Sequence, residues 1–221
     1  MDDRFLAETI ARKPQLFRAM LAFNRPGTTA VPEELSRLGE PVSLLWKDAA
    51  FRRAWPVKEA VVEGFWNFSE ESRRIALLDA PTLRKLGLYF SAAAHAGELS
   101  RVIARRDVLE LRQSIGADTL AYALKRGRYQ MGSLRQMLLP PPSCGSLPHR
   151  IELLASTSFS LLCADWPEEL RNLAADILPR PETLSPDFSP QLRREQRTAL
   201  WFTMKKLLLR EVAPEWAPCF D

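Results

Sequence analysis

Cysteine, histidine and glycine are scarce in this chain of 221 residues, and each shortage excludes a class of protein. Cys144, Cys163 and Cys219 are the three cysteines. They are widely separated and form no Cys-x-x-Cys pair, so a disulfide scaffold is excluded, and neither a zinc site nor a redox motif is indicated. The longest weakly polar stretch, 86–97, has about 12 residues, whereas a membrane-spanning helix needs roughly 20.

Glycine is outnumbered by proline, 9 to 17. This ratio is typical of short helices that are broken at intervals, and it disfavours β-hairpin turns. Apolar residues recur at helical spacing almost throughout. The sequence therefore predicts an all-α fold, a single irregular globular domain over 1–221 with about eight to ten short helices. A proline-rich loop near 139–148 should separate the central helices from the C-terminal ones.

The helix boundaries follow from capping signals. Ser69, Asp79, Asp107 and Asp118 are the expected N-caps. Glycines should end two of these helices, at 97 and 116. The expected helices, with approximate bounds, are 5–21 with a break at Pro14, one opening at 32, 44–55, 69–78, 79–97, 98–106, 107–116, 118–125, 149–164, one opening at 167, and 191–212.

A search for catalytic motifs finds none. The chain has no phosphate-binding glycine loop, no metalloprotease motif and no nucleophile elbow. The two histidines, His95 and His149, leave few groups for acid–base chemistry. His95 ends an alanine-rich helix, where an imidazole that caps the helix is the simpler interpretation than a catalytic base. We therefore expect no enzymatic activity, and no catalytic, cofactor-binding or metal-binding residues.

Positive charge is concentrated in the middle of the chain. Residues 84–135 contain ten Lys or Arg and four Asp or Glu, a net charge of +6 within a chain of net charge +4. Such a segment favours an acidic partner surface or a nucleic acid, unless it is only a solvated face. The candidate interface residues here are Arg101, Arg105, Arg106 and Arg112.

The segment 108–125 reads as helix, glycine, helix, and on the surface resembles a DNA-binding helix-turn-helix. With Gly116 as the turn glycine, a small residue is needed four positions earlier, where the two helices cross. That position holds Arg112. The long charged side chain argues against the motif, and a helical nucleic-acid-binding or regulatory protein is kept as the alternative function.

The last helix carries an apolar stripe formed by Leu200, Met204, Leu207, Leu208 and Val212. The simpler interpretation is a helix buried in the core. The alternative is that part of this face docks another protein, with Lys205, Lys206 and Arg210 at the rim. Full burial of Met204 and Leu208 would count against that alternative.

Several short motifs lie along the chain in a characteristic order. They are Phe23-Asn24-Arg25-Pro26, Leu86-Gly87-Leu88, His95-Ala96-Gly97-Glu98 with Arg101-Val102-Ile103, Leu109-Glu110-Leu111-Arg112, Ile115-Gly116, Tyr122-Ala123-Leu124 and Lys205-Lys206-Leu207. In this order the chain resembles the SctK (YscK-type) family of type III secretion systems. It departs from the family at 28–32, where members often carry an aromatic residue and a His-Pro pair.

The resemblance implies a non-enzymatic adaptor of the sorting platform beneath the injectisome. Such proteins link the cytoplasmic domain of the inner-membrane ring protein SctD to the SctQ pods, and through them to SctL and the SctN ATPase. The implied location is the cytoplasm, peripheral at the inner membrane, without direct membrane insertion and without nucleic acid. The N-terminal Met1–Arg4 also lacks the basic-then-apolar order of a signal peptide.

Overall fold

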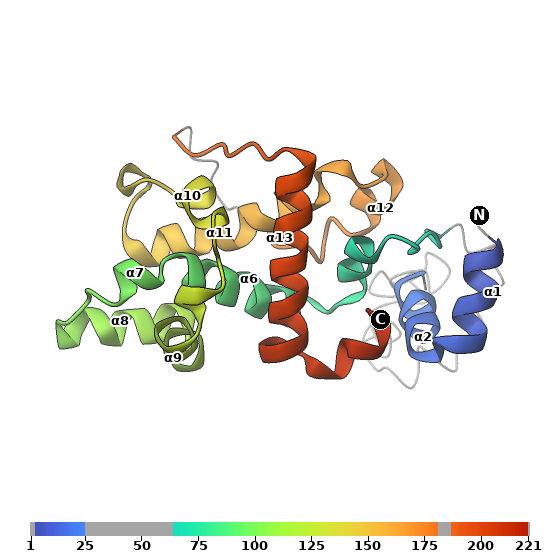
Figure 1. The fold of residues 1–221 in the computed structure, drawn as a ribbon, viewed down its shortest axis with the longest axis horizontal. Coiled ribbons are helices and arrows are strands. Elements are labelled where there is room, and N and C mark those ends of the chain that lie inside the picture. Colours follow the sequence, from blue (N-terminus) through green and yellow to red (C-terminus); the bar gives the residue numbers. More distant parts are fainter. Residues whose placement is uncertain (1–2, 25–63, 181–186, 221) are drawn as a thin grey trace, which may run out of the picture. The chain divides into compact units, whose positions relative to one another are not determined.

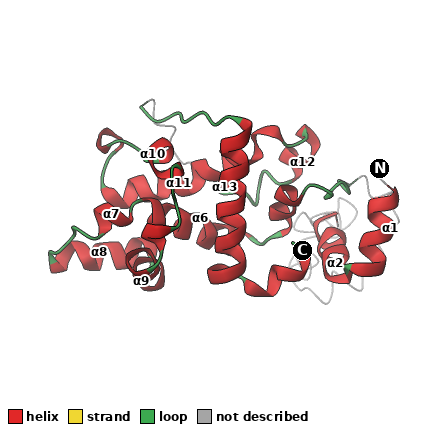
Figure 2. Ribbon diagram, in the orientation of Figure 1, coloured by secondary structure: helices red, strands yellow, loops and turns green. Residues whose placement is uncertain are grey.

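A computed structural model describes residues 3–24, 64–180 and 187–220, which are helical with no strand among them (Figures 1 and 2). For this part of the chain the all-α prediction is confirmed. The chain divides into two compact units, Met1–Asn67 and Phe68–Asp221. The sequence predicts one domain with its main break near 139–148. That break lies inside the second unit, and the division after residue 67 was not expected.

The described helices of the first unit are α1 (Asp3–Arg12) and α2 (Pro14–Asn24). Pro14 stands at the first position of α2, so the predicted break between the two helices is confirmed. The Asn24 side-chain amide donates to the carbonyls of Met20 and Phe65, at 3.0 and 2.9 Å, and joins the end of α2 to the later segment. The helices expected at 32 and over 44–55 lie outside the described residues.

The second unit is built from short helices. Its helices are η1 (Glu71–Leu77), α6 (Ala80–Ala94), α7 (Ala96–Leu99), α8 (Arg105–Ile115), α9 (Ala117–Lys125), α10 (Leu134–Leu138), α11 (Leu147–Leu162), α12 (Glu168–Leu173) and α13 (Arg194–Leu207), and a π-helical turn, η5 (Leu208–Val212), continues α13. Single 3-10 turns fill several connections, one of them at Pro142–Cys144 in the proline-rich segment.

Helices α6 and α11 pack closely at the centre of this unit. Leu83, Leu86 and Phe90 of α6 are fully buried. Gly87 allows the close approach, because a Cβ atom built there would lie 3.0 Å from both the Ala155 carbonyl oxygen and a Phe159 ring carbon. These two helices form the base on which the shorter ones are arranged.

The start of α6 is as expected, whereas its end is not. The Asp79 carboxylate accepts a hydrogen bond of 2.8 Å from the Thr82 backbone N–H, as an N-cap does. The helix ends at Ala94 with His95 as its C-cap, and Gly97 lies within the following turn, α7. The predicted end at Gly97 is therefore wrong. Residues 92–96 are all buried, so the turn at the end of α6 lies within the core.

Four other predicted boundaries are also wrong. No helix spans 98–106, because α7 ends at Leu99 and the chain runs through an irregular loop to α8. Ala104 and Gly116 are the N-cap residues of α8 and α9, whereas Asp107 and Asp118 lie in the first turns, where the helix dipole favours acids. The N-cap of η1 is Glu70 instead of Ser69.

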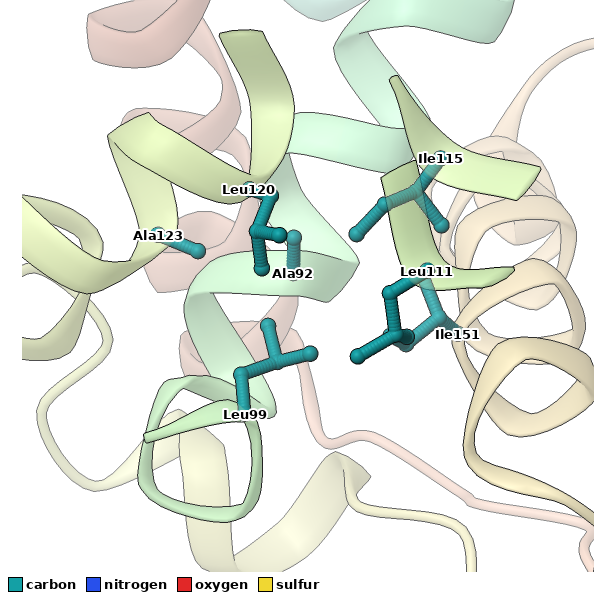
Figure 3. Packing of buried hydrophobic residues seen from close by; sticks show 7 residues of the cluster. All are labelled: Ala92, Leu99, Leu111, Ile115, Leu120, Ala123 and Ile151. Carbon is teal, nitrogen blue, oxygen red and sulfur yellow. The ribbon is translucent and has the colours of Figure 1, made fainter. Parts of the chain in front are cut away.

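A cluster of buried apolar residues holds α8 against its neighbours (Figure 3). Leu111 and Ile115 of α8 point toward Ile151 of α11 and Ala92 of α6. Val102 and Val108 pack against the same cluster. The cluster consists of Ala92, Leu99, Leu111, Ile115, Leu120, Ala123 and Ile151. It fixes α8 and the loop before it on the body of the unit.

The apolar stripe of α13 belongs to the core. Leu200, Met204, Leu207 and Leu208 are fully buried, which confirms the core interpretation for them and counts against docking through them, whereas Val212 at the end of the stripe is half-buried. Phe202 lies outside the stripe and is 60% exposed. Among the helices that the structure describes, none is long and apolar enough to cross a membrane.

Candidate functional site

Four arginines lie at the end of the second unit formed by α8. Arg105, Arg106 and Arg112 are on the helix, and Arg101 is in the loop before it; all four are exposed. None of their side chains makes an ion pair or hydrogen bond with another described residue. We call these four residues the α8 arginine surface. Their charges are free to attract an anionic group.

The helical repeat explains why these side chains face solvent. Val108, Leu111 and Ile115 share the face of α8 that packs on the core cluster. Leu109 lies outside that face and is 47% exposed. Its neighbours three and four positions away along the helix are Arg105, Arg106, Arg112 and Gln113. One exposed apolar side chain is thus surrounded by three cations.

The loop that leads into α8 presents a second apolar group. Ile103 is 88% exposed, although Val102 beside it packs on the core. A shallow hollow on α8 is lined by Arg105, Arg106, Leu109, Glu110 and Gln113. The sequence identified the arginines but not the exposure of Ile103 and Leu109. The spacing of Leu109 from Val108 and Leu111 is the signal that places it off the buried face.

Lys205 and Lys206 do not join this surface. The Lys205 ammonium donates to the Glu71 carboxylate at 2.7 Å and to the Phe220 carbonyl at 2.6 Å. It therefore ties α13 to η1 and to the C-terminal segment. Lys206 is exposed on α13, which stands apart from α8 within the second unit (Figure 1). The six candidate residues are not brought together.

The segment His95-Ala96-Gly97-Glu98, which carries much of the family resemblance, is structural. His95 is fully buried, and its Nδ1 donates to the Ser91 carbonyl oxygen at 2.9 Å. This confirms the helix-capping imidazole. Burial is the main cause that lowers the pKa of His95, so the imidazole is held neutral. Its Nε2 has no hydrogen-bond partner among the described residues.

Two further contacts anchor the same segment. Arg150 of α11 donates to both carboxylate oxygens of Glu98, at 2.5 and 3.3 Å, and to the Pro140 carbonyl. Gly97 faces Arg135, whose guanidinium nitrogen would lie against any added Cβ atom. These side chains hold the turn between α6 and the loop that leads to α8. They are not available as a reactive site.

Another hollow, of about 380 Å³, lies between α6, α11 and the chain at 176–180. Charged side chains of both signs line it, namely Arg84, Glu152, Asp176 and Arg180, together with His149. Ser156 donates to the carbonyls of Glu152 and Leu153, so its hydroxyl is engaged by its own helix. No group of three or more His, Cys, Asp or Glu suited to a metal ion occurs within 3–24, 64–180 and 187–220.

Comparison with known proteins does not extend this description. No family model, no curated protein and no solved structure matches the chain.

Proposed function

We propose that this protein is a non-enzymatic cytoplasmic adaptor of a bacterial type III secretion sorting platform. In this role it would link the cytoplasmic domain of SctD to SctQ, and indirectly to SctL and the SctN ATPase, and so lie at the inner membrane through the secretion apparatus. The motif order of the sequence supports the family, and the α8 arginine surface is the structural observation that carries the adaptor role.

An adaptor needs a fixed surface with unsatisfied binding capacity. The α8 arginine surface has this property, because its four cations lack partners among the described residues while the opposite face of the helix is locked into the core. Complementary charge speeds the encounter of two proteins and selects the partner. We therefore assign the contact with an acidic partner surface to Arg101, Arg105, Arg106 and Arg112.

The test is co-purification of the full chain with the SctD cytoplasmic domain and with SctQ. The variant in which all four arginines are replaced by Glu should lose at least about tenfold in affinity for one of the two, since each replacement turns an attraction into a repulsion. The four positions are exposed, so the free energy of unfolding of the variant should lie within about 1 kcal/mol of that of the original protein.

The matched control replaces Arg4, Arg18, Arg171 and Arg180 by Glu. These arginines are also exposed, and the change in net charge is the same. Undiminished binding is expected for the control. If the wild-type chain captures neither SctD nor SctQ, the adaptor proposal fails. If it captures them and the α8 variant does so equally well, the surface has been assigned wrongly.

A nucleic acid is the competing partner for a basic surface. Phosphate contacts would make the affinity fall steeply with salt. Titration with duplex DNA and with single-stranded RNA at two salt concentrations decides between a nucleic acid and an acidic protein as the partner. An adaptor is expected to show no measurable binding to either nucleic acid at physiological salt.

A further inference from the structure

The α8 arginine surface has an apolar part that charge alone does not explain. We propose that this surface recognises an acidic polypeptide segment that also presents an aliphatic or aromatic side chain, with Leu109 and Ile103 as apolar contacts and the arginines as the charged ones. The inference rests on the proposed function, since it names the chemistry of the partner at the same site.

The exposure of Leu109 and Ile103 is the first argument. Both are large apolar side chains, 47% and 88% exposed, and they lie six positions apart in the sequence. Burying such side chains against a partner contributes roughly 25 cal/mol for each Å² of apolar surface. Apolar contacts enclosed by charged ones are the usual arrangement at protein interfaces, where arginine is enriched.

The arrangement on the helix is the second argument. Arg105, Arg106 and Arg112 flank Leu109 at spacings of three and four residues, so their guanidinium groups can reach around one inserted side chain. Gln113 and Glu110 complete the shallow hollow beside it. A partner that places carboxylates on either side of an apolar group would match the three arginines and Leu109. Arginine binds such carboxylates with two parallel hydrogen bonds.

Nucleic acid fits the same surface poorly. Ile103 and Leu109 offer no ring on which a base could stack, which is how single strands are commonly held. An acidic polypeptide is therefore the occupant that the observations favour.

The experiment titrates the full chain, labelled with ¹⁵N, with a defined helical probe of about 18 residues, or five turns. The probe carries leucines along one face and glutamates on both sides of them. A second peptide has alanine in place of each leucine at equal charge. An oligothymidylate of the same charge is the third probe. Amide shifts report both where each probe binds and how tightly.

The leucine peptide should shift amides of the segment 101–113, and the alanine peptide should bind at least about tenfold more weakly. Leu109→Asp and Ile103→Asp should each weaken the leucine peptide by a similar factor. Leu124→Asp is the matched control, because Leu124 is 40% exposed on the neighbouring helix α9 and lies outside the surface. This control should bind like the original protein.

Three results would overturn the inference. They are equal binding of the leucine and alanine peptides, tighter binding of the oligothymidylate, and absence of any shift up to about 1 mM peptide. None of them depends on SctD or SctQ. If the peptide titration fails while SctD or SctQ is still captured, the apolar contact is rejected. If the leucine peptide binds as expected while neither SctD nor SctQ is captured, only the secretion role is rejected.

Discussion

Arg150 of α11 and Glu98 of α7 form a two-pronged ion pair, with nitrogen–oxygen distances of 2.5 and 3.3 Å. The Arg150 side chain is 8% exposed and that of Glu98 is 31% exposed. The two residues lie 52 positions apart in the sequence, so the pair joins two distant helices. It fixes the turn from which the loop to α8 departs, and thereby helps to hold the α8 arginine surface in place.

Breaking this pair should destabilise the protein. Glu98→Ala leaves a buried guanidinium without its carboxylate, and we expect a loss of about 2–4 kcal/mol in the free energy of unfolding. The double variant Glu98→Ala, Arg150→Ala should lose less than the sum of the two single changes. Urea unfolding measures all three.

The control for this pair is Arg84→Ala. The Arg84–Glu152 pair is 3.8 Å long and both side chains are largely exposed, so a change within about 0.5 kcal/mol is expected. A loss as large as that of Glu98→Ala would show that the cost does not come from burial.

His95 should make the stability depend on pH. Its pKa in the folded protein is lowered from 6.5 mainly by burial; Arg150 and Arg135 add to the effect, while the Ser91 hydrogen bond and Glu98 oppose it. Below pH 6.5 the unfolded chain therefore binds more protons than the folded one, and stability falls as the pH falls. The slope cannot exceed about 1.4 kcal/mol per pH unit for one group.

Unfolding free energies measured between pH 7.5 and 5 test this dependence, a range chosen because carboxylates titrate below about pH 5. His95→Gln should remove the slope over this interval, whatever its effect on the absolute stability. An unchanged slope in His95→Gln would assign the dependence to another group.

Gly87 and Gly97 should respond differently to alanine. At Gly87 the added methyl group meets the Ala155 carbonyl and the Phe159 ring at 3.0 Å, and neither can move without shifting α11. A loss of about 1–3 kcal/mol is expected. At Gly97 the obstacle is the flexible end of Arg135, so the change should stay within about 1 kcal/mol. Equal losses at both positions in thermal unfolding would contradict this account.

Gly116 connects α8 and α9 with φ 88° and ψ 147°, a conformation that side chains strongly disfavour. Gly116→Ala should cost about 1–3 kcal/mol. Gly132 has φ 48° and open space around it, and asparagine adopts such a conformation readily, so Gly132→Asn should be nearly neutral. Calorimetric melting of both variants compares the two losses of stability. A Gly116→Ala variant as stable as the original protein would show that α8 and α9 can be connected by a different backbone conformation.

Much of the local structure could be predicted because its causes are local. Asp79 caps α6, Pro14 opens α2, and Gly116 closes α8, each through interactions within a few residues. The boundaries at 97 and 98–106 could not be predicted in this way. There the chain follows the burial of His95 and the contacts of Glu98 and Arg150, which join distant segments.

The sequence by itself determined the all-α class and the excess of positive charge in the central segment, because helical periodicity and composition are properties of the chain alone. Only the tertiary structure decided how those charges are used. It engages Lys205 in an internal ion pair and buries most of the stripe of α13, while the side chains of Arg101, Arg105, Arg106 and Arg112 stay exposed and unpaired. Whether a polar side chain serves the core or a partner depends on which distant groups the fold brings to it.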